Sequence, residues 1–431
     1  MVILSAMNII EPRILKGTRD FLPQDKAKRD FVMKRIISIF ERYGYDSIET
    51  PVIEYAETIL GKYGAEGDKL TYNFEDHGCR QVALRYDQTV PFARLYAANH
   101  NDLPSPFKRY QISRVWRADK PQKGRYREFY QCDIDIIGTD SLLVELELVK
   151  VMNDVLLDLG FEDFTIKMND RALMDSVLDG VGVPAENRIP VITAIDKLEK
   201  IGQDGVWLEF DKIGISDSQK EELSPLLDRT GTNEEKLERF DGFMTKRIEK
   251  MLELSSLSDI KPGCLQFDVS LARGLDYYTG IIFEVVLNGV DIGSVCGGGR
   301  YDDLCGSFSK KEFTGTGISF GFDRLVLAME ESGLLEDVGL NSKVLVTLFD
   351  EKHEADSINV LEILHNGGIN AEMYFEPVKL GKQFKYADKK GIPYVVVAGP
   401  EEVGNSSVLL KTMASGEQQE VALEDLINHI S

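Results

Sequence analysis

The chain has 431 residues, of which 43% are hydrophobic and 9% aromatic. At roughly 100–200 residues per domain, this length predicts two to four domains, and the composition excludes a largely disordered protein. The longest apolar runs fall far short of the ~20 residues that a membrane helix needs. The short apolar stretch at residues 1–10 is not followed by a small-residue cleavage pattern. We therefore expect a cytoplasmic chain with no signal peptide and no membrane contact.

The chain carries 50 basic and 72 acidic residues, a formal charge of −22. Such a charge normally counts against a nucleic-acid partner, because phosphate binding needs Lys and Arg. Residues 101–130 depart from this balance, with eight basic residues against three acidic ones. Aromatic residues alternate with these cations, which favours a polyanion site over a solvated charged face.

The first part of the chain predicts a mixture of helices and strands. A helix is expected over residues 31–43, where apolar residues recur at helical spacing and Gly44 follows as the C-cap. Another helix is expected over 142–160. β-branched and aromatic residues predict strands at 45–53 (interrupted by Pro51), 80–86, 107–116, 129–137 and 164–168.

Residues 171–258 change in character, with a helical, turn-punctuated pattern and 12 basic residues against 18 acidic ones. We interpret them as an insertion, because strand character returns at 265–269 and 279–287. A linker is expected over 334–342. The following alternation of strands and helices predicts a small α/β domain with a largely parallel sheet.

The stretch V-W-R-A-D-K-P-Q-K-G-R-Y-R-E-F-Y-Q-C-D-I-D (115–135) is predicted to form a strand, a loop and a second strand. Arg117, just before the loop, suits a phosphate, because a guanidinium binds oxyanions through two donors. On the second strand, period two places four residues on one face: Phe129, Gln131, Asp133 and Asp135. A surface hairpin with cross-strand ion pairs is the alternative.

Three further segments have the composition of a binding site. A-L-R-Y-D-Q-T-V-P-F-A-R (83–94) places Asp87 and Thr89 where an acid and a hydroxyl can hold an ammonium group; a turn or N-cap role for Asp87 is the alternative. R-G-L-D-Y-Y-T-G (273–280) offers two tyrosines, each a flat wall with a hydroxyl; a strand start with core aromatics is the alternative.

The third comprises two glycine-bearing stretches, C-G-G-G-R-Y-D (296–302) and G-T-G-I-S-F-G-F-D-R-L (315–325). Glycines permit close approach of backbone to a ligand. The spacing matches neither G-x-G-x-x-G nor G-x-x-x-x-G-K-[ST], so ATP would have to be bound by another architecture. Arg324 is expected at the start of a helix, where it can reach a phosphate or simply lie on the helix surface.

The histidines and cysteines predict no metal site. The cysteines number five, are widely scattered and form no C-x-x-C pair, which fits a reducing compartment. The five histidines lie outside all of these segments: His77, His100, His353, His365 and His429. A metal site made of protein histidines or cysteines, or a Ser–His or Cys–His nucleophile, is therefore not expected.

Taken together in this order, the segments resemble the histidyl-tRNA synthetases, which are class II aminoacyl-tRNA synthetases. The resemblance extends from G-T-R-D-F-L-P (17–23) to the C-terminal domain. Residues 43–54 are similar to class II motif 1, 115–129 to motif 2 and 315–325 to motif 3, while 273–280 and 296–302 match segments peculiar to the histidine enzymes. Asp87 and Asp119 stand where many bacterial members have Glu, a difference that we do not expect to affect activity.

The resemblance implies a histidine–tRNA ligase that uses ATP and Mg²⁺. Residues implied to bind histidine are Asp87, Thr89, Gln131, Asp135, Tyr277 and Tyr278. Those implied to bind ATP are Arg117, Asp119, Arg125, Phe129 and Arg324, and the implied catalytic residues are Arg273 and Arg117. The partners would be L-histidine, tRNA(His) and a second copy in a homodimer. Three lysines at i, i+3 and i+7 of a predicted helix are expected to touch the tRNA: Lys382, Lys385 and Lys389.

The resemblance also implies the fold. Residues 1–170 and 259–333 would form an α+β catalytic core on an antiparallel sheet, interrupted by the helical insertion at 171–258. The linker at 334–342 would lead to a C-terminal α/β anticodon-binding domain at 343–431. The alternative function is a non-charging paralogue that acts as a regulatory subunit of histidine biosynthesis. A sensor that binds uncharged tRNA without catalysis is a third, but it would tolerate losses at Arg117, Arg273 or Arg324, and none is lost.

Overall fold

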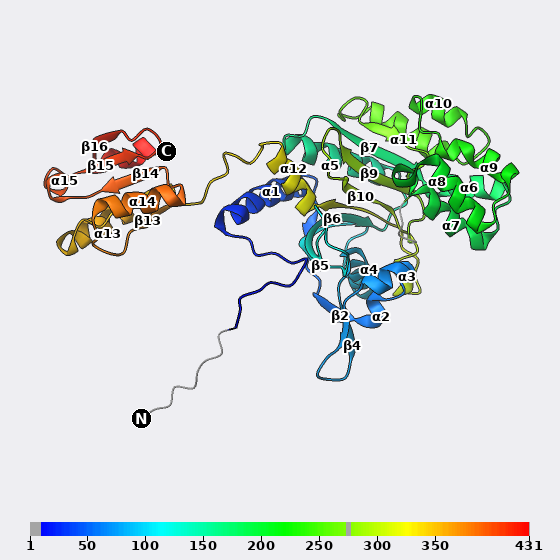
Figure 1. Cartoon of the computed structure of the whole chain (residues 1–431), viewed down its shortest axis with the longest axis horizontal. Coiled ribbons are helices and arrows are strands. Elements are labelled where there is room, and N and C mark those ends of the chain that lie inside the picture. The colour runs from blue at the N-terminus through cyan, green and yellow to red at the C-terminus, as the bar shows by residue number, and fades with distance from the viewer. Residues whose placement is uncertain (1–9, 273–276, 431) are drawn as a thin grey trace. The chain divides into compact units, whose positions relative to one another are not determined.

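The computed structural model describes residues 10–272 and 277–430 (Figure 1). The chain forms two compact units. One comprises Val32–Leu334 with the described residues up to Asp20, and the other comprises Phe21–Phe31 with the residues from Leu335 onward. None of the described helices is both long and apolar enough to span a membrane.

Two of the elements predicted before the insertion differ in extent, and α2, α3, β3 and α4 were not predicted. Helix α1 begins at Pro23 rather than near Phe31, because proline is well suited to the first turn of a helix. The strand expected over 45–53 is wrong between β1 and β2. Pro51 lies there and has no N–H to donate to a neighbouring strand. These elements are α1 (Pro23–Arg42), β1 (Asp46–Ser47), β2 (Ile53–Tyr55), α2 (Ala56–Ile59), α3 (Gly64–Leu70), β3 (Asn73–Glu75), β4 (Gln81–Leu84), α4 (Thr89–Asn99), β5 (Phe107–Trp116), β6 (Glu128–Ile137), α5 (Leu143–Asp158) and β7 (Phe164–Asp170).

The insertion is helical, as expected, and its green helices gather beyond one edge of the sheet (Figure 1). Capping boxes at Ser216 and Thr232 start two of these helices. The helices are α6 (Arg171–Gly180), α7 (Ala185–Ile195), α8 (Leu198–Ile213), α9 (Asp217–Leu223), α10 (Asn233–Glu238) and α11 (Lys246–Ser256). They are followed by β8 (Leu265–Phe267), β9 (Ile281–Leu287), β10 (Ser294–Arg300), β11 (Gly315–Gly321) and α12 (Phe322–Glu331).

The main sheet has eight strands in the order β1-β5-β6-β11-β10-β9-β7-β8. All neighbours from β5 to β7 are antiparallel, whereas the pairs at the two edges, β1–β5 and β7–β8, are parallel. The expected α+β core on an antiparallel sheet is therefore confirmed. Parallel neighbours need a long crossover, and the insertion is the chain that connects β7 to β8.

The two faces of β6 carry different chemistry. The Tyr130 ring lies 5.8 Å from Phe322 of α12, and the alternate residues Cys132 and Ile134 are fully buried. Because side chains alternate across a strand, the opposite face carries the four residues predicted to share it: Phe129, Gln131, Asp133 and Asp135. This second face is the one available to a ligand.

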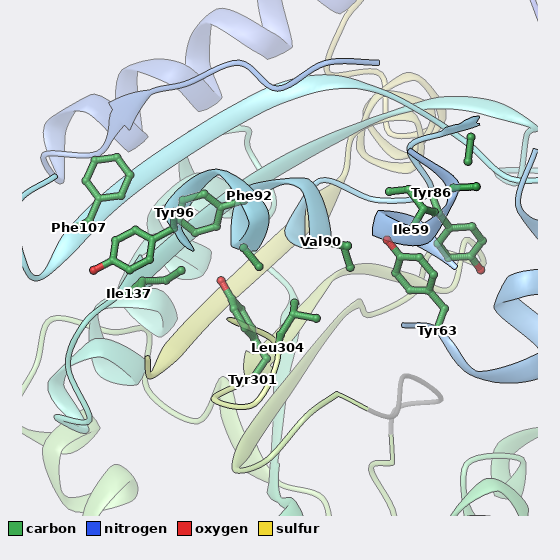
Figure 2. Close-up of a cluster of buried hydrophobic side chains, with 13 residues drawn as sticks. Ile59, Tyr63, Tyr86, Val90, Phe92, Tyr96, Phe107, Ile137, Tyr301 and Leu304 are labelled. Atoms are coloured by element: carbon green, nitrogen blue, oxygen red, sulfur yellow. The ribbon is translucent and has the colours of Figure 1, made fainter. Parts of the chain in front are cut away.

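A buried cluster rich in aromatic residues contains several residues of helix α4 and Ala83 of the small sheet β2-β4-β3 (Figure 2). Its members include Tyr63, Tyr86, Phe92, Tyr96 and Tyr301. Figure 2 shows Tyr63 and Tyr86 close together, with Tyr301 beneath the helix that carries Phe92 and Tyr96. Burying each such side chain stabilises the fold by about 1.5–3 kcal/mol. The tyrosines of this cluster are therefore held firmly in place.

The second unit has a five-stranded sheet in the order β13-β12-β14-β15-β16. The first three strands are parallel, but β14–β15 and β15–β16 are antiparallel. The expectation of a largely parallel sheet is thus only half right, because β15 and β16, for which no strand was predicted, add an antiparallel hairpin. The elements are β12 (Val344–Val346), α13 (Glu354–Asn366), β13 (Ala371–Met373), α14 (Leu380–Lys390), β14 (Tyr394–Val397), α15 (Pro400–Gly404), β15 (Ser407–Thr412), β16 (Gln418–Ala422) and α16 (Leu426–Ile430).

Candidate active site

A cavity of about 340 Å³ opens on the polar face of β6. This volume lies within the range of roughly 300–1,000 Å³ that is usual for ligand sites. The structure brings eleven of the predicted residues to its walls: Asp87, Thr89, Arg117, Asp119, Arg125, Phe129, Gln131, Asp135, Tyr277, Tyr278 and Arg324. Arg273 lies outside the described residues, and the three predicted lysines belong to the second unit.

Glycines on β10 and β11 leave room for the cavity and for its acidic group. Gly317 pairs with Asp135 across the sheet, and a Cβ there would lie 1.9 Å from Asp135 Oδ1. A Cβ at Gly298 would lie 2.0 Å from the Gly317 carbonyl oxygen. The glycine-bearing segments therefore serve close approaches within the protein.

Asp135 lies in a buried network that sequence reasoning did not foresee. Arg109 Nη2 is 2.5 Å from Asp135 Oδ2, and Tyr301 Oη donates a hydrogen bond to Asp135 Oδ1. Burial raises the pKa of Asp135, while Arg109 and the Tyr301 hydroxyl oppose that rise. Arg109 and the Tyr301 hydroxyl therefore offset part of the cost of burying a carboxylate at the wall of the cavity.

Asp133, two residues earlier, is also buried. Burial raises its pKa to about 7, Arg109 opposes the rise and the negative charge of Asp135 adds to it. Its Oδ1 makes no hydrogen bond with any described residue. Asp133 and Asp135 therefore share the single positive charge of Arg109.

The contacts of Asp87 bear on both of the roles that the sequence left open. Its Oδ1 accepts hydrogen bonds from Tyr63 Oη at 2.8 Å and from the Val90 N–H at 3.1 Å, in the first turn of α4. Its Oδ2 and the Oε1 of Gln131 make no hydrogen bond with the described part of the chain. Gln131 Nε2 donates to Ser319 Oγ at 3.1 Å. Both residues line the cavity, so two acceptors remain for a ligand with several N–H donors.

A second group of side chains is basic. Arg117 Nε donates to the Tyr86 carbonyl at 3.1 Å, and its guanidinium lies 5.3 Å from the Phe129 ring centroid. Arg125 Nη2 is 2.7 Å from Asp119 Oδ1. Arg324 lies in the first turn of α12, as predicted, and its Nη1 donates to the Ser294 carbonyl at 2.5 Å. Three arginines on one cavity suit a polyphosphate.

The N-terminal motif also reaches this site. Arg19 Nη2 donates to Asp323 Oδ1 at 2.5 Å, and Asp323 Oδ2 accepts the Tyr130 N–H at 2.9 Å. The Arg127 N–H donates to the Gly17 carbonyl at 2.8 Å. The segment therefore braces the β5–β6 hairpin at the side of the cavity where Asp323 lies.

The prediction missed the roles of Arg109, Tyr63, Tyr301 and Asp323. The role of Arg109 could have been found from the sequence. When the predicted strands 107–116 and 129–137 pair with each other, Arg109 lies directly opposite Asp135. Tyr63 had no such signal, since its hydroxyl reaches Asp87 only through tertiary packing. No group of three or more His, Cys, Asp or Glu side chains that could hold a metal occurs among the described residues.

The antiparallel sheet and its arginine-bearing cavity define the class, a class II aminoacyl-tRNA synthetase. The profile of the family described as Histidyl-tRNA synthetase matches residues 17–325, and that of an anticodon binding domain matches residues 341–431. The chain therefore belongs to the histidyl-tRNA synthetase family of enzymes, the histidine–tRNA ligases.

Relatives cover nearly the whole chain. Histidine–tRNA ligase of Christiangramia forsetii is 42% identical, over 96% of this chain and 98% of the relative. That of Rhodopirellula baltica is 41% identical, over 96% of each. The histidyl-tRNA synthetase structure from Nostoc is 31% identical with a TM-score of 0.87, over 98% of this chain and 99% of that one.

A structure described as an ATP phosphoribosyltransferase regulatory subunit/histidyl-tRNA synthetase, from Bacillus halodurans, is 22% identical with a TM-score of 0.77, over 90% of this chain and all of that one. At this identity the likeness concerns the fold alone.

Proposed function

We propose that this enzyme attaches L-histidine to tRNA(His) in two steps. A carboxylate oxygen of histidine attacks the α-phosphorus of ATP, the bond to the bridging oxygen breaks, and pyrophosphate leaves. A terminal ribose hydroxyl of the tRNA then attacks the carbonyl carbon of histidyl-adenylate, and AMP leaves. The observation that carries the proposal is one cavity in which buried carboxylates and tyrosines accompany three arginines.

Histidine would be held by the acidic and tyrosine side chains. The ammonium group would donate to Asp87 Oδ2 and Gln131 Oε1, which make no hydrogen bond with the described residues, and to the hydroxyl of Thr89. A neutral imidazole has one donor and one acceptor, which Asp135 and the Tyr278 hydroxyl would satisfy, with Tyr277 beside them. A site with such buried partners rejects analogues that lack these groups by large factors.

ATP would be held by the arginines. Arg117 would bind the α-phosphate and the histidine carboxylate, Arg324 the γ-phosphate end, and Phe129 would stack on adenine. Arg125 would assist, oriented by its ion pair with Asp119. Arg273 would stabilise charge at the α-phosphate in the transition state, a role that rests on the family resemblance alone. Charge stabilisation is the expected main contribution in attack on a phosphate.

Mg²⁺ fits this cavity as an ion shared with ATP. Mg²⁺ usually takes one or two carboxylates together with substrate phosphates. Glu284 lines the cavity and would supply a carboxylate. When bound, the ion would neutralise charge on the phosphate oxygens.

The second unit would contact the tRNA. Lys382, Lys385 and Lys389 are exposed on α14, opposite the buried Gln383 and Ala387. Five of the twelve residues from 379 to 390 are lysines, which gives this acidic chain a local basic surface.

We further propose a cytoplasmic homodimer with the domain boundaries given above. Val52, Ile53, Tyr55 and Phe74, on or next to the small three-stranded sheet, are each at least 40% exposed, which supports a face covered by a second copy.

Transfer of labelled histidine to total tRNA by the purified protein, with ATP and magnesium, tests the proposal, and an Arg273→Ala variant serves as the control. Charging that disappears in the variant is expected. Histidine-dependent ATP–pyrophosphate exchange without charging would contradict the second step, the transfer of histidine to tRNA. Absence of both activities from folded protein would favour the regulatory alternative.

A further inference from the structure

A buried charge cluster joins the insertion to the wall of the cavity. Glu145 of α5 is fully buried, and its Oε1 lies 2.7 Å from Arg300 Nε and 3.3 Å from Arg247 Nη2. Arg300 ends β10, whereas Arg247 lies in α11, the last helix of the insertion. Arg247 Nε is also 3.7 Å from Asp170 Oδ2, where the insertion begins. Arg247 thus links the exit of the insertion to its entrance and to the core.

This cluster holds the segment that follows the two cavity tyrosines. The Thr279 N–H donates to the Arg300 carbonyl at 2.9 Å, and the Arg171 N–H donates to the Gly280 carbonyl at 3.0 Å. A Cβ at Gly280 would lie 3.1 Å from Arg300 Cδ and 3.2 Å from Arg247 Nη1. Because glycine has no side chain, position 280 leaves room for both arginine side chains. This packing gives Gly280 a structural reason that the proposed binding roles did not supply.

Two cavity residues depend directly on this arrangement. Tyr278 immediately precedes Thr279, and its side chain packs with Leu271 and Ile282. Tyr301 immediately follows Arg300, and its hydroxyl donates a hydrogen bond to Asp135 Oδ1. Glu145 Oε2 and Arg300 Nη2 make no hydrogen bond within residues 10–272 and 277–430. A fully buried carboxylate whose charge is balanced by two arginines is sensitive to the loss of either one.

We propose that Arg247 is a positioning residue for histidine binding, through which the last insertion helix sets the position of Tyr277 and Tyr278. The inference rests on the proposed role of these tyrosines in holding histidine. Because coupling between sites is reciprocal, bound histidine and the position of α11 stabilise each other.

The test is the KM for each substrate in histidine-dependent ATP–pyrophosphate exchange by the full chain. Arg247→Ala is expected to raise the KM for histidine about tenfold and to change the KM for ATP less than about twofold. Arg247→Lys keeps a charge and should recover part of the loss. Lys250→Ala is the matched control, because Lys250 is exposed on the same helix and pairs with Glu253 of that helix.

A double-mutant cycle with Tyr278→Phe adds a readout that a general loss of stability would not move. If Arg247 acts through Tyr278, the two effects on the KM for histidine combine to less than their product. Equal KM values for histidine in Arg247→Ala and Lys250→Ala would overturn the proposal. If Arg247→Ala fails to fold, an unchanged KM in Arg247→Lys would do the same. Failure of the proposed function is separate, since the unmodified protein would then show no histidine-dependent exchange.

Discussion

Arg109 and Asp135 lie directly opposite each other on β5 and β6 and form a buried ion pair of 2.5 Å, in which Asp135 lines the cavity. The Arg109 guanidinium also lies 4.4 Å from the Phe92 ring centroid. The pair therefore connects the proposed imidazole-binding carboxylate to the aromatic core beside α4. Its removal should affect both stability and histidine binding.

Arg109→Ala leaves Asp135 buried without its ion partner, and such a loss costs about 3–5 kcal/mol in the free energy of unfolding. The pKa of Asp135 should rise further, because the group that opposes the effect of burial is gone. We expect a lower denaturant midpoint and a higher KM for histidine. Arg114→Ala is the control on the same strand, where a half-exposed pair with Glu128 contributes about 1 kcal/mol or less. Equal effects of the two substitutions would contradict the role of Arg109.

Gly317→Ala would place a methyl group 1.9 Å from Asp135 Oδ1. Either the carboxylate or the strand must move, so exchange with histidine should fall by about 100-fold or more. Gly339→Ala is a suitable control, because nothing lies within 4 Å of a Cβ at that position. Circular dichroism of both variants checks that they are folded. Normal exchange in a folded Gly317→Ala variant would refute this reading of the strand.

Asp133 predicts a pH dependence of stability. Its pKa is about 7 in the folded protein and about 3.9 in the unfolded chain, so the folded state binds the proton more tightly. Its stabilising contribution is complete below the unfolded value and is lost as pH rises through the folded one, by an amount of about 2–4 kcal/mol. Asp133→Asn removes this titration and should be the more stable form at pH 8. Urea unfolding at several pH values measures the stability of the unmodified protein and of Asp133→Asn. Parallel profiles of stability against pH for these two proteins would disprove the prediction.

We expect the lysines of α14 to contribute to tRNA binding in a salt-dependent way and to contribute nothing to ATP–pyrophosphate exchange. Replacing Lys382, Lys385 and Lys389 by Ala should weaken tRNA binding and reduce the slope of log K against log salt by about 2. ATP–pyrophosphate exchange should not change, since it needs no tRNA. Lys352→Ala provides an exposed lysine in the same unit for comparison. An unchanged salt slope in the triple variant would place the tRNA elsewhere.

The sequence by itself determined the elements that have a strong local signal. Strands β5 and β6 followed from β-branched and aromatic content, the insertion from its helical pattern, and the first turn of α12 with Arg324 from a glycine-to-helix transition. Period two then described the faces of β6. The same alternation placed Gln131 and Asp135 on one face of β6. The family could be inferred because several such segments occur together in one order.

Only the tertiary structure decided which groups neutralise and hold these residues. Tyr63, Arg300 and Arg247 act on the site from segments distant in sequence, and no local pattern encodes such a contact. The hairpin β15–β16 was missed for a related reason, because a polar edge strand is stabilised by its neighbour rather than by its own apolar residues. Local propensity specifies an element, whereas burial and charge pairing depend on which elements pack together.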